Sequence, residues 1–197
     1  MAADHFVHLL QVSMPLQVAE TIADGALKAG AEAGLLPLTV AVLDVGGHLV
    51  VLKRQDGSGN FRADIAIGKA AGALGMGISS RTIRDRLKDR PAFQSAIAAA
   101  SDGRFIPVPG GVLVLNEAGD AIGAVGISGD ASDKDEYAAV SGVHAALPRA
   151  ALATALVVNN EVGTVQDAAE IAAAASEADV PLHLDAVGAV GHLPVSF

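Results

Sequence analysis

The chain has no cysteine and no tryptophan, and it contains only one tyrosine and five phenylalanines. Without cysteine it cannot form a disulfide, a thiolate metal site or a thiol nucleophile. Hydrophobic residues still make up 51% of the chain, so we expect small and branched aliphatic side chains, rather than rings, to fill the core. A length of 197 residues suits one domain, or one domain with an appendage.

Basic residues are scarce, because 13 Lys and Arg stand against 22 Asp and Glu, for a net charge of −9. Nucleic-acid binding usually needs clustered cations, so we expect no nucleic-acid partner. The one basic cluster, "RTIRDRLKDR", has Asp85 and Asp89 interleaved. We interpret it as a solvated helix face.

Long apolar runs are also missing. No segment approaches the ~18 uninterrupted apolar residues of a membrane-spanning helix. The N-terminal "MAADHFVHLLQVS" has neither the basic start nor the long apolar run of a secretory signal. These features predict a cytoplasmic protein with no membrane partner.

Five segments have helical spacing or helix-end signals. Ser79 or Ser80 is expected to cap the third segment, Pro91 to open the fourth and Ser132 to cap the fifth. Gly34 is expected to end the first. The predicted helices cover residues 15–33, 60–78, 79–89, 91–100 and 132–147.

Two pairs of β-rich runs are joined by short turns, "DVGGH" and "EAGD". Glycine supplies the positive φ angles of tight hairpins, and hairpins make neighbouring strands antiparallel. We therefore predict an α+β fold in which helices cover one or both faces of a mainly antiparallel sheet.

The pattern changes after Pro148. From Ala155 the order becomes strand, helix, strand, and the strands are short continuous apolar runs typical of parallel strands buried on both faces. We therefore predict a first domain over residues 1–147 and a short β-α-β fragment over 148–197 that does not fold independently.

Four motifs of the first domain occur in order: "VAVLDVGGHLVVLKRQDGS", "DIAIGKAAGAL", "PGGVLVLNEAGDAIGAVGISG" and "DKDEYAAVSGVHAAL". Together they resemble the GlcG/HbpS family, also called the haem-degrading or PduO C-terminal-like domain, over about residues 14–147. The resemblance implies a profilin-like fold and a homo-oligomer. Some family members bind haem, and others are linked to haem degradation, cobalamin metabolism or glycolate utilisation.

Several residues of this domain are candidate ligand contacts. His48 follows the Gly-Gly turn, where a neutral imidazole could ligate haem iron; the alternative is a surface turn histidine. Lys69 could meet a propionate or another carboxylate, or simply lay its stem on apolar surface. Gly110 and Gly111 could line an anion pocket with their N–H groups, and Asp44 could contact the ligand or satisfy the turn.

These candidates leave three functions open. The first is binding of haem or a related tetrapyrrole, with haem as the cofactor and His48 as its iron ligand. The second is an enzyme or binder for a small carboxylate, in which Lys69 holds the anion and Asp44 or His48 transfers a proton. The third is a non-catalytic oligomeric module, so whether the protein is an enzyme stays open.

The last residues, "ALVVNNEVGTVQDAAEIA" and "VPLHLDAVGAVGHLPV", resemble a different family, the NifS/IscS-type cysteine desulfurases. These are fold-type I pyridoxal-phosphate enzymes. The resemblance implies that Asn159 or Asn160 matches the segment beside the cofactor, and that Asp185 matches the residue that pairs with the pyridine nitrogen.

Chemistry excludes that activity on this chain alone. The cofactor needs a lysine for its Schiff base, and no lysine follows Lys134; the family also needs a cysteine, and there is none. Leu184 and Gly188 also depart from the family pattern. We therefore predict no bound pyridoxal phosphate and interpret residues 148–197 as an inactive relic of a gene fusion.

Overall fold

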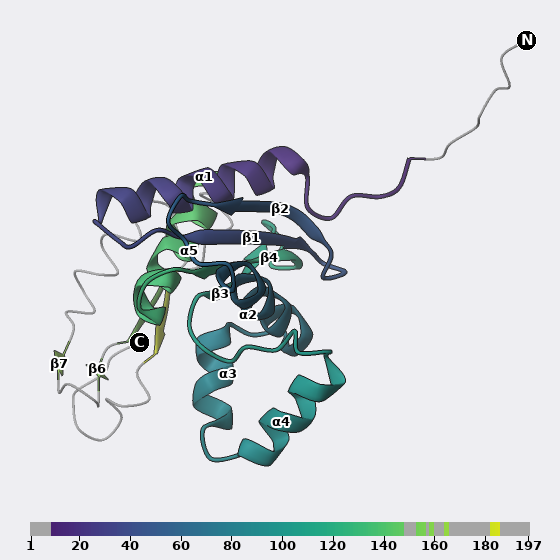
Figure 1. The fold of residues 1–197 in the computed structure, drawn as a ribbon, viewed down its shortest axis with the longest axis vertical. Coiled ribbons are helices and arrows are strands. Elements are labelled where there is room, and N and C mark those ends of the chain that lie inside the picture. Colours follow the sequence, from purple (N-terminus) through teal and green to yellow (C-terminus); the bar gives the residue numbers. More distant parts are fainter. Residues whose placement is uncertain (1–8, 148–152, 157, 160–163, 166–181, 186–197) are drawn as a thin grey trace, which may run out of the picture.

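The computed structural model describes residues 9–147 and four short strands beyond them, at 153–156, 158–159, 164–165 and 182–185. Residues 9–147 form an α+β domain around one four-stranded antiparallel sheet (Figure 1). The predicted fold class is confirmed at this level.

The sheet is built from two hairpins that meet at its centre, in the order β2-β1-β4-β3. β1 pairs antiparallel with both β2 and β4, and β3 pairs antiparallel with β4. Strands β2 and β3 are therefore the two edges. The strands are β1 (Thr39–Asp44), β2 (Leu49–Arg54), β3 (Gly111–Leu115) and β4 (Ala121–Ser128).

Both predicted hairpin turns are confirmed. In the β1–β2 turn only the second glycine of the pair, Gly47, has a positive φ, of +80°. In the β3–β4 turn Gly119 has a φ of +86°, and the Asn116 side chain accepts hydrogen bonds from the backbone N–H groups of Ala118 and Asp120. Glycine is needed at these two positions because other residues rarely adopt such φ angles.

Helices cover both faces of the sheet. α1 (Leu16–Glu32) and α5 (Ser132–Ala146) lie together on one face. α2 (Arg62–Met76) lies on the other face, and α3 (Ser80–Leu87) and α4 (Pro91–Ala100) extend beyond it (Figure 1).

The core is made of small and branched side chains, as the composition predicts. The main cluster lies between the sheet and the α1–α5 layer, and its buried members are Met14, Ala19, Ile22, Ala23, Ala26, Leu38, Val40, Val42, Val51, Val114, Val125, Ile127, Ala138, Ala139 and Val143. Phe105 is the one buried aromatic side chain in the described part of the chain. Small side chains let helix and sheet backbones approach closely, which makes the packing sensitive to added volume.

The helix-end predictions have mixed outcomes. Ser79 is the N-cap of α3, and its Oγ accepts a hydrogen bond from the Thr82 N–H at 3.3 Å. Pro91 opens α4 as predicted. The prediction that Ser132 caps α5 is wrong, because Ala131 occupies the N-cap position and has no side-chain oxygen that could accept a hydrogen bond.

Beyond residue 147 the described residues form two strand pairs. β5 (Ala153–Leu156) pairs in parallel with β8 (Leu182–Asp185), which confirms the predicted parallel strands. The antiparallel pair of β6 (Val158–Asn159) and β7 (Thr164–Val165) was not predicted. The predicted intervening helix lies outside the described residues, and the domain boundary stays a prediction.

Replacing Gly126 with alanine tests the close approach of α2 to the sheet. A Cβ at this position would collide with the carbonyl oxygen of Ala66 in α2, and backbone cannot move aside cheaply. We expect Gly126→Ala to lower the free energy of unfolding by about 1–3 kcal/mol, measured by urea denaturation.

The matched control is Gly75→Ala, on the exposed side of the same helix, where a Cβ meets nothing within 4 Å. Its better helix propensity should raise the free energy of unfolding by up to about 1 kcal/mol. Equal effects of the two changes would contradict the close packing of α2 on β4.

Candidate functional site

Lys69 lies on the face of α2 that packs against the sheet, and its side chain is buried. Its ammonium donates one hydrogen bond to the carbonyl oxygen of Ile127 in β4 and another to Oδ2 of Asp135 in α5, both at 2.8 Å. The Asp135 carboxylate is equally buried. A single lysine thus joins three elements from both sides of the sheet.

Burial acts on both charges of this pair. It lowers the pKa of Lys69 and raises the pKa of Asp135, while the hydrogen bond between the two groups opposes both shifts. The other carboxylate oxygen of Asp135 accepts the backbone N–H of Asp130 at 3.0 Å. With these partners the pair is satisfied, as a buried ion pair must be.

The two predicted loop glycines, Gly110 and Gly111, lie directly against Lys69. Gly110 has a φ of +117°, and a Cβ there would lie 2.9 Å from Nζ of Lys69. A Cβ on Gly111 would collide with the Lys69 carbonyl oxygen. Glycine is required at both positions, because the loop passes over Lys69 with no room for a side chain.

The N–H of Gly111 already has a partner within the protein. It donates to Oγ of Ser80 in α3 at 2.8 Å, and the same hydroxyl donates back to the Gly111 carbonyl at 3.2 Å. An anion held by this N–H would therefore have to displace Ser80. Two of the three N–H donors of the Lys69 ammonium are also engaged within the protein.

His48 and Asp44 form a second cluster, at the tip of the β1–β2 hairpin. The backbone N–H of His48 donates to Oδ1 of Asp44 at 2.9 Å, and Nδ1 of the imidazole lies 3.3 Å from Oδ2. The His48 side chain is 82% exposed. A Cβ at Gly46 would lie 2.8 Å from Nδ1, so glycine there lets the imidazole fold back toward Asp44.

Hydrogen bonds stabilise the ionised form of the Asp44 carboxylate. The pKa of Asp44 is lowered, first by the bond from the His48 backbone N–H and then by the imidazole itself. An ionised carboxylate prefers a proton on Nδ1 of the imidazole. That tautomer leaves the lone pair of Nε2 available for a metal.

The structure does not bring all five predicted residues together. Ile127, which holds Lys69, pairs with Val40 near the start of β1, whereas Asp44 ends β1 and pairs with Gly123. At about 3.3 Å per residue, these two ends of β1 are roughly 13 Å apart. Lys69, Gly110 and Gly111 form one cluster, and Asp44 with His48 forms another.

A shallow depression of about 590 Å³ lies near the start of β1 and the end of β2. It contains none of the predicted site residues. Its lining residues are Ala31, Leu35, Pro37, Arg54, Gln55 and Asp56.

Asp135 is the partner that the sequence reasoning missed. A lysine among the small residues of "IAIGKAAGAL" is a signal in itself, because buried lysines are almost always paired. The identity of the partner was hidden, since Asp135 lies 66 residues away among the polar residues that open α5.

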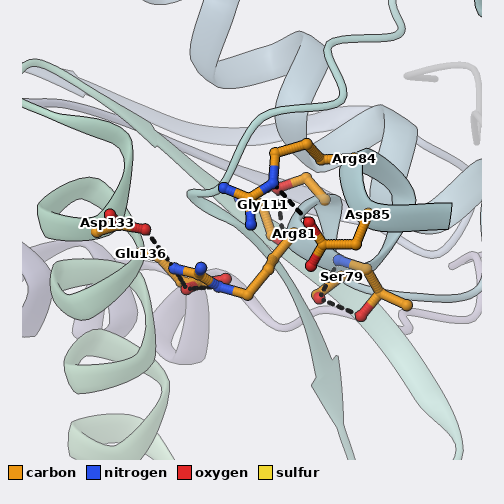
Figure 2. Close-up of polar contacts among 9 residues, drawn as sticks. Ser79, Arg81, Arg84, Asp85, Gly111, Asp133 and Glu136 are labelled. Atoms are coloured by element: carbon orange, nitrogen blue, oxygen red, sulfur yellow. Dashed lines mark hydrogen bonds and ion pairs between the residues drawn. The ribbon is translucent and has the colours of Figure 1, made fainter. Parts of the chain in front are cut away.

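A second missed feature ties α3 to α5. Arg81 Nε donates to Glu136 Oε2 and Arg81 Nη2 to Asp133 Oδ1, each at 2.6 Å. Figure 2 shows this arginine reaching the two α5 carboxylates, while Arg84 pairs with Asp85 on its own helix. The basic cluster therefore includes two interhelical ion pairs, both made by Arg81, and is not wholly a solvated face.

The structure describes only part of the C-terminal segment that resembles a cysteine desulfurase. Asn159 lies in β6 and Asp185 ends β8, whereas Asn160 lies outside the described residues. The prediction that they hold no cofactor stays a prediction. Among the described residues there is no group of three or more His, Asp or Glu that could hold a metal ion, and none of the described helices is long and apolar enough to span a bilayer.

Comparison with known protein families shows to which family this chain belongs. The family model described as haem-degrading protein HbpS-like matches residues 14–144. The chain belongs to this HbpS-like family. The match runs from just before α1 almost to the end of α5, and so covers the whole sheet and both of its helical layers.

Several solved structures share the fold. The Klebsiella pneumoniae protein ORFY aligns with a TM-score of 0.63 at 23% identity, covering 72% of this chain and 96% of that one. PduOC, solved as a complex with haem, gives 0.60 at 21%, covering 68% and 95%. HbpS itself gives 0.57 at 24%, covering 72% and 94%.

The C-terminal resemblance is also confirmed. The aminotransferase class-V model matches residues 131–197. An IscS-like cysteine desulfurase of Mycobacterium tuberculosis is 49% identical over 47 residues, which are 24% of this chain and 12% of the desulfurase. The chain thus carries only a small part of such an enzyme.

Replacing Lys69 with alanine tests the buried pair. The change leaves the Asp135 carboxylate buried without its counter-charge, so we expect the free energy of unfolding to fall by about 3–5 kcal/mol. The double change Lys69→Met with Asp135→Leu should recover most of that loss, because no charge is then stranded. Chemical denaturation of the variants measures both.

The control is Lys28→Ala, which breaks the exposed Lys28–Glu32 pair and should leave stability almost unchanged. A Lys69→Ala protein as stable as the parent would show that the pair is not buried as described.

Proposed function

We propose that the domain binds haem or a related tetrapyrrole, and that His48 supplies the ligand to the iron. The observation that carries the proposal is the His48–Asp44 pair at the hairpin tip, in which Nδ1 is held and Nε2 has no hydrogen-bond partner among the described residues. A histidine whose other ring nitrogen is fixed by a carboxylate is the usual form of a protein metal ligand.

Apolar surface flanks this histidine. Val45, on one side in the turn, is 54% exposed, and Leu49, which starts β2, is 49% exposed. A porphyrin ring offers a large apolar face that could cover such side chains and remove them from water. Family membership and the haem-bound PduOC relative support the same ligand class.

The rival ligand, a small carboxylate held by Lys69, has less support. The Lys69 ammonium is buried and already pairs with the Asp135 carboxylate. A second carboxylate would have to enter the core and lie beside this like charge, which is costly. We therefore assign Lys69, Gly110 and Gly111 to the support of the fold, and the ligand to the hairpin tip.

Titrating the haem-free, full-length protein with haem tests the proposal. We expect saturable binding with a Soret shift, and loss of that shift in His48→Ala because the iron loses its ligand. The matched control is His144→Ala, a partly buried histidine on α5, which should bind as the parent does. Unchanged binding and spectrum in His48→Ala would overturn the proposal.

Asp44→Asn tests the role of the carboxylate separately. An anionic partner makes an imidazole a stronger electron donor and stabilises ferric iron, so its neutral replacement should raise the reduction potential of the bound haem while binding persists. Spectroelectrochemical titration measures the potential. An unchanged potential would show that Asp44 does not hold the coordinated ring.

A further inference from the structure

Among the described residues no strand pairs with the outer edge of β2. This free edge exposes two leucines on the same face. Leu49 is 49% exposed and Leu52 is 42% exposed. In a regular strand, residues three apart point to opposite faces. The pairing of β2 with β1 slips by one residue here, so Leu49 lies opposite Leu43 and Leu52 opposite Ala41.

This one-residue slip in the pairing of β1 and β2 is a β-bulge, and it places both leucines on the α2 side of the sheet. Ala41 also pairs with Gly126, the glycine that α2 contacts, and Leu43 packs with Ala70 of α2. α2 lies mainly over β1, β3 and β4 and makes only slight contact with β2, so it leaves most of β2 uncovered. We call Leu49 and Leu52 the β2 strip.

A short apolar segment leaves the domain beside the β1–β2 turn, close to the end of β2 where Leu49 lies. Residues 9–12, "LLQV", precede α1 and belong to no helix or strand. Leu9 is 97% exposed, Leu10 85% and Val12 65%. Ser13, which follows them, accepts a hydrogen bond from the backbone N–H of Val45 in the β1–β2 turn at 3.2 Å. We call residues 9–12 the arm.

The arm and the β2 strip match in spacing. Leu10 and Val12 are two residues apart, so in an extended chain they face one side, about 6.6 Å apart. Leu49 and Leu52 stand opposite β1 residues that are also two apart. An arm added to β2 as a further strand would therefore set Leu10 and Val12 beside these two leucines.

We propose that the arm of one copy of this chain adds as a strand to the free edge of β2 in a second copy, with Leu10 and Val12 packed on its Leu49 and Leu52. The edge supplies unpaired backbone N–H and C=O groups for such strand addition. The arm carries no charge that would oppose burial.

A second copy is the occupant because the chain contains both halves of the contact. In this structure the arm runs away from its own sheet, as Figure 1 shows, and its leucines stay exposed. Both arm and strip start beside the β1–β2 turn, so a two-fold axis near that turn lets each arm cross to the other copy. Such an exchange uses every arm and closes at a dimer.

The absence of cysteine from the chain makes the contact directly testable. Two full-length variants, Leu10→Cys and Leu52→Cys, are mixed without haem and oxidised. We expect a mixed disulfide dimer, in which peptide mass spectrometry identifies the bond between the two introduced thiols. The control pairs Leu10→Cys with Leu36→Cys, an exposed leucine that is not part of the strip, and should give little of that product.

The double variant Leu10→Cys/Leu52→Cys separates exchange from folding back. Exchange predicts cross-linked dimers, whereas a cross-linked monomer would show that the arm covers its own strip and would overturn the proposal. Light scattering of the unmodified protein must likewise show a dimer that dissociates on dilution, and a monomer at all concentrations tested would also overturn it.

Leu52→Glu gives an independent readout. A charge on the strip must be desolvated by the incoming arm, so we expect at least a tenfold weaker dimer, whereas Leu36→Glu should leave the dimer unchanged. A dimer that Leu52→Glu does not weaken would place the interface elsewhere. Leu49 belongs both to the β2 strip and to the surface that the proposed haem would cover, so arm and haem would compete for it. Because these experiments use haem-free protein, their outcome does not depend on the proposed haem binding.

Discussion

The buried ion pair of Lys69 and Asp135 is the constraint on which the rest of this domain depends. It connects α2 on one side of the sheet, the end of β4 within it and α5 on the other side. Because neither charge can be left alone in the interior, these elements must assemble together. The glycines at 110 and 111 follow from the same constraint, since the loop into β3 must pass over the lysine.

This arrangement separates the part of the domain that holds the fold from the part that is free to bind. Polar groups around Lys69 are engaged with one another, whereas the β1–β2 turn presents an exposed imidazole beside apolar side chains. Binding residues are often placed on loops held by a rigid scaffold. Membership in the HbpS-like family fits a scaffold of this kind, in which the same sheet can carry different loops.

Local patterns explain how much could be predicted from the sequence. Gly47, Gly119 and Pro91 act through their own backbone geometry, and Ser79 acts through a hydrogen bond to a residue three positions away. Turns and helix starts could therefore be placed from them. The partner of Lys69 could not, because Asp135 is distant in sequence and its burial depends on how α5 docks. The separation of Lys69 and His48 along β1 could not be predicted either, since strand order and register decide which loops meet.

Mapping a tetrapyrrole on the domain residue by residue tests the central claim most directly. Gallium protoporphyrin is a diamagnetic mimic of haem, so its titration can be followed through the backbone amide signals of the full-length protein by NMR. The account predicts that signals of residues 44–49 shift in a saturable way while those of Lys69, Gly110, Gly111 and Asp135 do not. Shifts centred on these four residues, with the β1–β2 turn unaffected, would contradict it.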